Sequence, residues 1–204
     1  MATTASIFDR IPSFSTVAVA ANENNAIDVP SFLAACQGLC SVFDLLGTAF
    51  SVIKSDIQGN ITKIDTKAKE GPQFNTLQAI LLSEVTQKKR TAAEGLLWLK
   101  RTLDLTNTAL KRNWADPTEE LSVSFNKAYE TTLSPFHSFI VRPVFSMAMK
   151  ACPTRADFYA KLGVESDASK AQFVEWLGGL DKVVTILNEL YIKEGVDKDI
   201  WARK

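Results

Sequence analysis

The chain has 204 residues, of which 46% are hydrophobic and 23% are charged, so it can bury the core of one domain and is not disordered. Lysine plus arginine and aspartate plus glutamate each number 23, and this balance argues against nucleic-acid binding and against recruitment to acidic lipid by charge alone. Three cysteines and one histidine argue against a disulfide framework and against a metal site. We therefore expect a cytoplasmic protein without a cofactor.

The first part of the chain is predicted to lie outside the main domain. Residues 1–29 are rich in alanine, asparagine, serine and threonine, and they predict a loosely ordered tail with room for one short helix. The apolar piece at residues 16–21 is too short for a signal peptide, and no segment approaches the roughly 20 apolar residues of a membrane span. Residues 30–204 predict a single domain.

Apolar residues recur at helical spacing through this domain, with no strand-like alternation. Pro30 is expected to open the first helix and Gly47 to close it. Isoleucines drive the second helix, which ends at Gly71-Pro72. A shorter helix follows at about residues 77–85.

The second half of the chain completes a prediction of about eight helices. Residues 92–110 carry two neighbouring apolar stripes, which are typical of a helix buried on two sides. Ser134-Pro135 fits either a kink within a helix or an N-cap followed by proline at the first helical position. A long last helix is expected over residues 173–191.

Three polar side chains share one face of the second predicted helix. Asp56, Asn60 and Lys63 are spaced i, i+4 and i+7, which places them on one side of a helix. A carboxylate, an amide and an ammonium together offer donors and acceptors to sugar hydroxyls, and an indole such as Trp98 offers a flat apolar plate. The same pattern also fits a solvated helix face beside a core tryptophan, and spacing alone leaves both interpretations open.

Four short motifs extend this observation. In chain order they are DIQGNITKI, LLWLKR, KAYETTL and FHSFIV, and they resemble the motifs of the glycolipid transfer protein family. The resemblance runs from about Phe32 to the C-terminal helix. It implies an all-α, two-layer helical sandwich that carries one glycosphingolipid between membranes. It also implies one long helix that is kinked at Pro135 and ended or bent again at Pro143.

The resemblance assigns the head-group contacts to the polar stripe. Asp56 is similar to the carboxylate that binds sugar hydroxyls and the ceramide amide N–H, whereas Asn60 and Lys63 are similar to the groups that complete the sugar contacts. Trp98 is similar to the stacking indole. The expected ligand is glucosyl-, galactosyl- or lactosylceramide, bound without a metal or a catalytic residue.

The resemblance also assigns the contacts to ceramide and to the membrane. His137 is similar to the residue that donates to the ceramide carbonyl, and Tyr129, eight residues earlier, would support it from the same helix side. Phe139 stands where animal members carry a membrane-facing tryptophan, and Ile140 and Pro143 would join it in a transient membrane contact. The expected apolar cavity for the ceramide chains is lined by Phe43, Phe50, Ile53, Phe158 and Leu162.

Three other functions are weighed against this one. A ceramide-1-phosphate carrier of the same fold would place cations at Asn60 and Trp98, and this chain has neither change. A lipid or glycoside hydrolase would need a G-x-S-x-G motif, metal-spaced histidines or a carboxylate paired with Asp56, and none of these is evident. A glycolipid sensor that acts through a partner protein is an alternative that transfer does not exclude.

Overall fold

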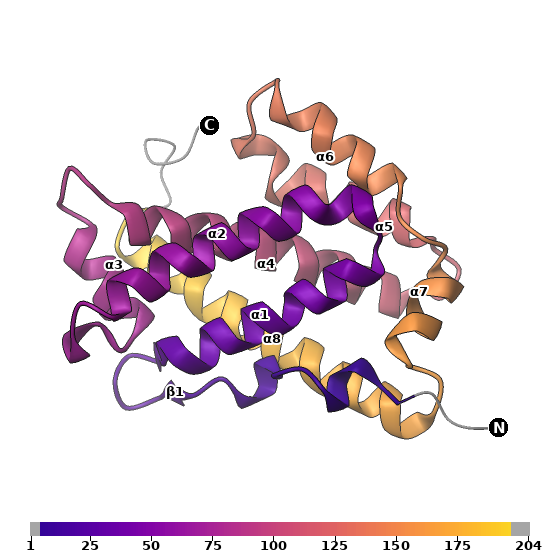
Figure 1. The fold of residues 1–204 in the computed structure, drawn as a ribbon, viewed down its shortest axis with the longest axis horizontal. Helices are drawn as coiled ribbons and strands as arrows, with labels where there is room; N and C mark the ends of the chain where they lie inside the picture. The colour runs from indigo at the N-terminus through magenta and orange to yellow at the C-terminus, as the bar shows by residue number, and fades with distance from the viewer. Residues whose placement is uncertain (1–4, 197–204) are drawn as a thin grey trace.

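A computed structural model describes residues 5–196 of the chain, and this part is almost entirely helical (Figure 1). The all-α prediction is confirmed, and the number of predicted helices agrees with the eight α-helices of the described residues. They are α1 (Val29–Leu45), α2 (Ser51–Ala68), α3 (Leu77–Glu84), α4 (Thr91–Ala115), α5 (Leu121–Thr132), α6 (Val141–Lys150), α7 (Arg155–Leu162) and α8 (Asp167–Lys193).

The helices form two layers around α4. In Figure 1, α1 and α2 run side by side in front, with α4 and α8 behind them. Helix α4 packs against α2, α3, α5 and α8, and its leucines Leu96, Leu99 and Leu103 are fully buried. Burial on several sides explains the two apolar stripes of this helix, so the prediction of a central helix is confirmed.

Local signals set the ends of the first helices. The carboxylate of Asp28 accepts a hydrogen bond from the backbone N–H of Ser31 (2.9 Å) and thereby caps α1, with Pro30 inside the first turn. Gly47 follows α1 with a φ of 99°, a backbone conformation that favours glycine. The chain therefore turns sharply there and begins α2 four residues later.

The segment before α1 is more ordered than its composition predicts. It holds two 3₁₀ turns, η1 (Ile7–Asp9) and η2 (Phe14–Thr16), and a two-residue antiparallel pair of strands. In that pair, β1 (Val19–Ala20) aligns with β2 (Ala26–Ile27). The expectation of a loose tail was therefore wrong for residues 5–28.

Packing against α8 explains why the segment is ordered. Phe14 is buried edge-on against Trp176 of α8, with 5.4 Å between the ring centroids. The backbone of Ser15 passes so close to Gly179 that a Cβ atom there would lie 2.2 Å from the Ser15 nitrogen. Composition alone gives no sign of this contact, because it depends on a glycine more than 160 residues away.

The region after α5 also differs from the prediction. Helix α5 ends at Thr132, a 3₁₀ turn η5 (Ser134–Phe136) follows, and α6 begins only at Val141. The continuous kinked helix was therefore wrong, because proline lacks an N–H and disfavours helical geometry in the residue before it. Pro143 does not end a helix either, since it lies in the first turn of α6, where the missing N–H costs nothing.

Two of the cysteines lie inside the core on α1. Burial raises the pKa of Cys36 well above its ordinary value and that of Cys40 to about 11. Both thiols are therefore protonated at neutral pH and pack as small apolar groups, as predicted. Among the described residues, no cluster of three potential metal ligands is found. A search of the same residues for a helix with the length and hydrophobicity of a membrane span also finds none.

Candidate functional site

The predicted polar stripe of α2 forms a hydrogen-bonded chain. Asn60 Nδ2 donates to Asp56 Oδ2 (3.0 Å), and Lys63 Nζ donates to Asn60 Oδ1 (2.9 Å). Asn60 is only 1% exposed, whereas Asp56 and Lys63 are partly exposed. The buried amide therefore holds a carboxylate and an ammonium in fixed positions, with hydrogen-bonding capacity left for a ligand.

Trp98 and His137 form the wall beside this stripe. Trp98 projects from α4, and His137 follows η5 in extended conformation. Their rings stack with centroids 5.6 Å apart and an interplanar angle of 18°. Both side chains are nearly buried, at 5% and 7% exposure. The structure thus brings together two residues that are 39 positions apart and that the sequence assigned to one site.

Arg101 is a neighbour of this wall that lies in the LLWLKR motif and received no role in the predicted site. Its guanidinium carbon lies 3.4 Å from the ring centroid of Phe136 and 5.2 Å from that of Trp98. Position i+3 from Trp98 on a helix was the available signal. His137 and Arg101 both lie close to the indole ring, and the stacking of a sugar on Trp98 stays a prediction.

A network of polar contacts fixes the loop that carries His137. The Tyr129 hydroxyl lies 3.0 Å from His137 Nδ1, although the two residues do not share the helix that was expected. Arg142 Nε donates to the backbone carbonyls of His137 (3.0 Å) and Ser134 (3.1 Å). Burial raises the pKa of Tyr129 despite the opposing charge of Arg142, so the phenol is neutral at pH 7.

Two hollows meet at Asp56. One is a polar groove of ≈650 Å³ along α2, and the other is a mostly apolar cavity of ≈160 Å³ between α2, α4 and α6. Asp56 and Val52 line both. The groove is otherwise lined by Ser51, Ser55, Gly59, Asn60 and Lys63, and the cavity by Trp98, Thr102, Leu133, His137, Val141 and Phe145.

The five residues predicted to hold lipid chains lie in the packed core. Phe43 contacts Phe50, and Phe50 contacts Phe125 of α5, with ring centroids 6.0 and 5.9 Å apart. Ile53, Phe158 and the other members of the set are at most 1% exposed, and none of the five lines the ≈160 Å³ cavity. Their role toward a lipid chain stays a prediction.

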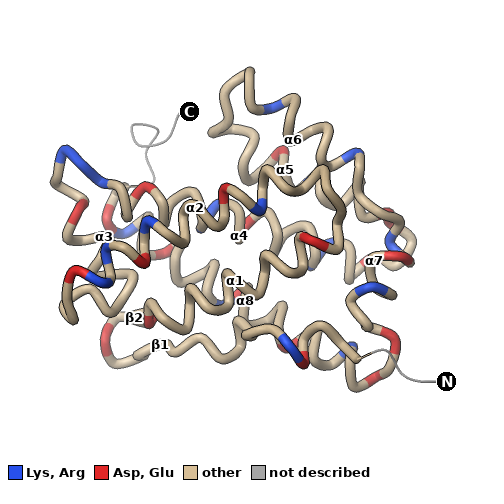
Figure 2. Tube along the Cα trace, viewed as in Figure 1, with Lys and Arg blue, Asp and Glu red and all other residues tan. Residues whose placement is uncertain are grey.

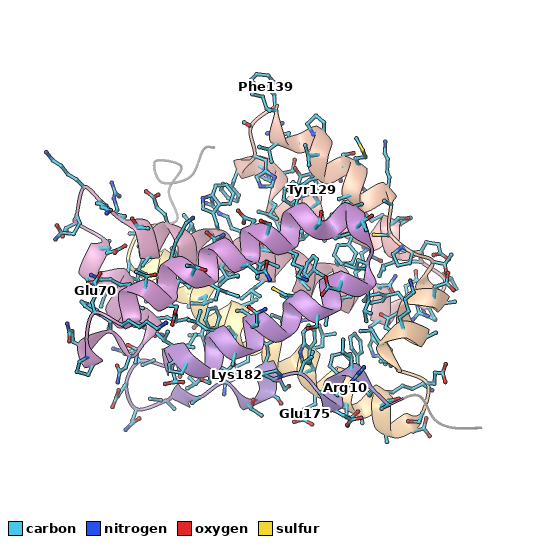
Figure 3. The ribbon with its side chains drawn as sticks, in the orientation of Figure 1. Arg10, Glu70, Tyr129, Phe139, Glu175 and Lys182 are labelled. Carbon is cyan, nitrogen blue, oxygen red and sulfur yellow. The ribbon has the colours of Figure 1, made fainter. Side chains whose placement is uncertain are left out.

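The predicted membrane contact is an exposed apolar tip. Phe139 is 82% exposed and points away from the helices at the end of the molecule (Figure 3), and Ile140 is 69% exposed. Pro143 is exposed in the first turn of α6. The sequence reasoning missed Met147, which is 70% exposed one turn further along α6.

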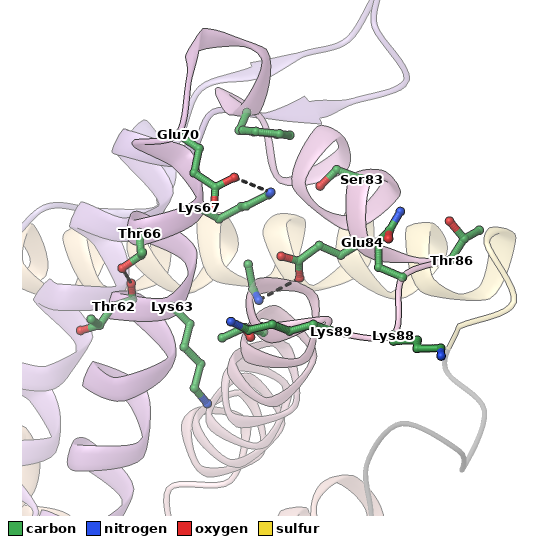
Figure 4. A pocket seen from close by; sticks show the side chains of 14 residues that line it. Thr62, Lys63, Thr66, Lys67, Glu70, Ser83, Glu84, Thr86, Lys88 and Lys89 are labelled. Atoms are coloured by element: carbon green, nitrogen blue, oxygen red, sulfur yellow. Dashed lines mark hydrogen bonds and ion pairs between the residues drawn. The ribbon is translucent and has the colours of Figure 1, made fainter.

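A larger polar groove of ≈1060 Å³ continues beyond Lys63 (Figure 4). It lies between α2, α3 and the connection to α4. Lys67 is paired with Glu70 (2.6 Å) on one wall. On the other, Glu84 accepts from the backbone N–H of Ala92 (2.9 Å), which satisfies the N-terminus of α4. Figure 2 shows acidic and basic residues scattered over much of the trace, with long stretches that carry neither.

Comparisons with known proteins agree with this geometry. The model of the family "Glycolipid transfer protein (GLTP)" matches residues 27–164. A glycolipid transfer protein from Aureobasidium melanogenum is 46% identical over 179 residues, which cover 87% of this chain and 88% of the relative. Human pleckstrin homology domain-containing family A member 8 is 36% identical over 195 residues, which cover 87% of this chain but only 37% of that protein.

Solved structures give the same result. The fungal glycolipid transfer protein HET-C2 superposes with a TM-score of 0.88 at 42% identity, over 93% of this chain and 98% of that one. A structure of FAPP2, described as selecting simple glycosphingolipids with this fold, gives a TM-score of 0.83 at 32% identity, over 96% and 99%. Mouse ceramide-1-phosphate transfer protein shares the fold, with a TM-score of 0.81 at 22% identity over 94% and 98%.

Proposed function

Because the chain belongs to the glycolipid transfer protein family, we propose that it binds one simple glycosphingolipid and carries it between membranes. The family consists of lipid carriers rather than enzymes. The sugar occupies the polar groove along α2, and Asp56, Asn60 and Lys63 bind its hydroxyls. His137 donates to the ceramide carbonyl, with Tyr129 supporting the imidazole.

One observation carries this proposal. Asp56 lines both the polar groove and the apolar cavity, so one carboxylate stands at the boundary between a sugar-compatible and a hydrocarbon-compatible surface. A glycosphingolipid has its own boundary at the ceramide amide, between the sugar and the two chains. The carboxylate can accept from a sugar hydroxyl and from the amide N–H at that boundary.

The head group is small and neutral in this proposal. Glucosyl- or galactosylceramide fits a site with one carboxylate and one nearby ammonium, and lactosylceramide would extend its second sugar beyond Lys63. The groove of ≈1060 Å³ that continues there offers hydroxyl and ammonium groups for it. The description of FAPP2 as selecting simple glycosphingolipids supports the same substrate class.

The ceramide chains require the cavity to widen. Pockets for drug-sized ligands hold about 300–1,000 Å³, whereas this cavity has ≈160 Å³. We propose that α6 moves away from α2 and that the chains then reach the core residues Phe43, Phe50, Ile53, Phe158 and Leu162. The protein acts as a monomer in the cytoplasm, and Phe139, Ile140 and Pro143 touch the membrane.

Transfer between vesicles tests the function. The protein should move fluorescent glucosylceramide from donor to acceptor vesicles without ATP and in the presence of a chelator. Asp56→Val should reduce transfer at least tenfold, since each charge-assisted hydrogen bond contributes about 1.5–3 kcal/mol. Asp65→Val is the matched control, because Asp65 lies on the same helix but pairs with Lys69 (2.5 Å) away from the site.

Circular dichroism should be unchanged in both variants, because both carboxylates are partly exposed. Normal transfer by Asp56→Val would refute the site. Cleavage of the glycolipid during the assay, or transfer that requires a metal, would refute the function.

A further inference from the structure

A further groove lies beside the loop that carries His137. It has a volume of ≈380 Å³ between α5 and α6, and its lining includes Tyr129, Glu130, Ser134 and Arg142. It shares no lining residue with the ≈160 Å³ cavity at Asp56. Phe139 also lines it, so the groove opens at the base of the exposed apolar tip (Figure 3).

Arg142 is the one lysine, arginine, aspartate or glutamate within residues 131–149. The neighbouring Phe139 and Ile140 are exposed and apolar. When this tip enters a bilayer, the guanidinium is carried to the level of the lipid head groups. Its charge is costly there without an anion, and a planar guanidinium binds phosphate oxygens well.

The opposite charge lies in the same groove. Glu130 is exposed near the end of α5 and lines the groove with Arg142. A site with one cation and one carboxylate matches a head group that itself carries a phosphate and an amine. A purely anionic head group would instead meet repulsion from Glu130.

We propose that this groove binds the head group of a zwitterionic phospholipid of the docked bilayer, with its phosphate on Arg142 and its amine beside Glu130. This proposal rests on the proposed membrane contact at Phe139. It adds a phospholipid site to the docking surface, distinct from the site for the carried lipid.

Two side chains of the groove, Arg142 and Tyr129, also contact the loop that carries His137 in the proposed glycolipid site. Arg142 uses Nε to hold the carbonyls of Ser134 and His137, and its two terminal NH₂ groups can bind an anion. Tyr129 lines the groove with its ring and contacts His137 with its hydroxyl. A phospholipid on Arg142 therefore contacts the same side chain that holds the His137 loop. Membrane binding can in this way change the position of His137 in the proposed ceramide site.

A soluble phospholipid tests the site without a bilayer. Dihexanoylphosphatidylcholine below its micelle concentration should cause saturable NMR shifts of the Arg142 Nε–H resonance and of the Phe139 amide. Dihexanoylglycerol, which has the same chains without phosphate and amine, should cause neither. Equal shifts with both lipids, or no shift with either, would overturn the proposal. Shifts centred on the Trp98 indole N–H would also overturn it, because they would place the lipid in the cavity at Asp56.

Vesicle binding provides the second measurement. Arg142→Gln should weaken sedimentation with phosphatidylcholine vesicles about tenfold, since it removes a charge-assisted contact, and Arg142→Lys should restore only part of the loss because an ammonium lacks the planar fork. Lys150→Gln, at the far end of α6, removes the same charge as a control and should bind normally. Full vesicle binding by Arg142→Lys, or an equal loss in Lys150→Gln, would show that only the positive charge matters. Either result would refute the site.

These measurements separate this proposal from the proposed function. Neither depends on glycolipid transfer, and Asp56→Val should leave both unchanged. If Phe139→Ser lost vesicle binding while the Arg142 Nε–H resonance did not shift with dihexanoylphosphatidylcholine, the proposed membrane contact would stand. The phospholipid site in the groove would be refuted.

Discussion

We propose that the hydroxyl of Tyr129 sets the tautomer of the His137 imidazole. A neutral phenol 3.0 Å from Nδ1 can donate to that nitrogen, which leaves the ring hydrogen on Nε2. A donor at Nε2 is what a ceramide carbonyl requires. The tyrosine thus acts by positioning, although it does not line the ≈160 Å³ cavity itself.

Tyr129→Phe should therefore weaken glycolipid binding without unfolding the protein. We expect a loss of about two- to tenfold in affinity, the usual net effect of one hydrogen bond of roughly 0.5–1.5 kcal/mol. Binding of short-chain glucosylceramide by calorimetry and the ¹⁵N spectrum of the His137 ring are the measurements. Tyr159→Phe, which alters another buried tyrosine on α7, should change neither. An unchanged ring tautomer in Tyr129→Phe would contradict this account.

The residues of the site differ in how far the sequence predicts them. The shared face of Asp56, Asn60 and Lys63 follows from spacing, because helix geometry alone brings i, i+4 and i+7 together, whereas their assignment to a ligand site follows from the family resemblance. Their hydrogen bonds in the structure agree with that spacing. Phe145 could not be predicted in this way. It reaches His137, at 4.4 Å between ring centroids, only because the chain turns back after η5.

At the scale of elements, the break between α5 and α6 shapes the docking tip. A continuous helix would have buried Phe139 or spread it along a flat face, whereas the loop projects it with 82% exposure. The sequence analysis expected Phe139 within a helix, whereas the structure places it in the loop between η5 and α6; its membrane contact stays a prediction. The family resemblance implied one long helix, whereas Pro135 indicated a break in the helix. The proline was the better guide to the local structure.

Phe139→Ser should lower binding to neutral phosphatidylcholine vesicles by about ten- to a hundredfold, because full burial of such a side chain contributes roughly 1.5–3 kcal/mol. Phe139→Trp should raise it, since an indole favours the membrane interface. Val123→Ser changes an exposed apolar residue on α5 and should have no effect. Sedimentation at low and physiological salt measures both variants. A steep fall of wild-type binding with salt would point to a basic patch in place of the apolar tip.

The connection between α4 and α5 depends on a single carboxylate. Glu119 accepts from Arg112 Nε (2.6 Å), Lys127 Nζ (2.8 Å) and the Ser124 hydroxyl (2.7 Å). The hydrogen bond from Arg112 is the main cause that lowers the pKa of Glu119 to about 2. The carboxylate thereby joins the end of one helix to the start of the next.

This depressed pKa gives a defined pH dependence of stability. A glutamate with a lowered pKa in the folded state stabilises the fold above its unfolded pKa of about 4.3. That contribution is lost as pH falls toward the folded pKa of about 2. Glu119→Gln should therefore unfold at lower urea concentration than wild type at pH 7, and the difference should shrink between pH 5 and pH 2. A difference that stays constant with pH would contradict the role of the charge.

At the scale of the whole molecule, we expect the placement of cations to select the head group. Lys100 lies 5.4 Å from the ring centroid of Tyr191 on α8, on another side of α4 from Trp98 and Arg101. Arg101 is stacked on Phe136 and is 2% exposed. A phosphate beside Asp56 would therefore meet a carboxylate with Lys63 as the nearest ammonium of the α2 stripe.

The protein should accordingly discriminate against ceramide phosphate. One like-charge contact at roughly 4 Å costs about 4 kcal/mol at an effective dielectric constant of 20, equivalent to about a thousandfold. The double change Asn60→Lys with Trp98→Arg should shift preference toward the phosphate. Competition between both lipids in one donor vesicle measures it, and circular dichroism checks that the buried Asn60 tolerates the change. Equal transfer of both lipids by the unmodified protein would show that other residues select the head group.

The overall architecture was more predictable than its edges. Periodic apolar residues predicted the helices and the central place of α4, because burial on several sides leaves a direct record in the sequence. The order of residues 5–28 was not predictable, since it depends on the close approach of Ser15 to Gly179. The cavity at Asp56 was equally hidden, because Val52, Leu133 and Val141 meet there from three separate elements.

Because Asp56 lies where two hollows meet, we expect the site to prefer a ligand that has both a sugar and a ceramide. A free sugar would reach Asp56 from the groove alone and a bare ceramide from the cavity alone, so each would use only part of the contacts of the proposed site. A molecule in which the two parts are covalently joined brings the second part at high effective concentration, so the two affinities multiply. The proposed carrier therefore selects lipids in which a sugar is covalently joined to ceramide. Molecules that offer only one of these two parts bind weakly.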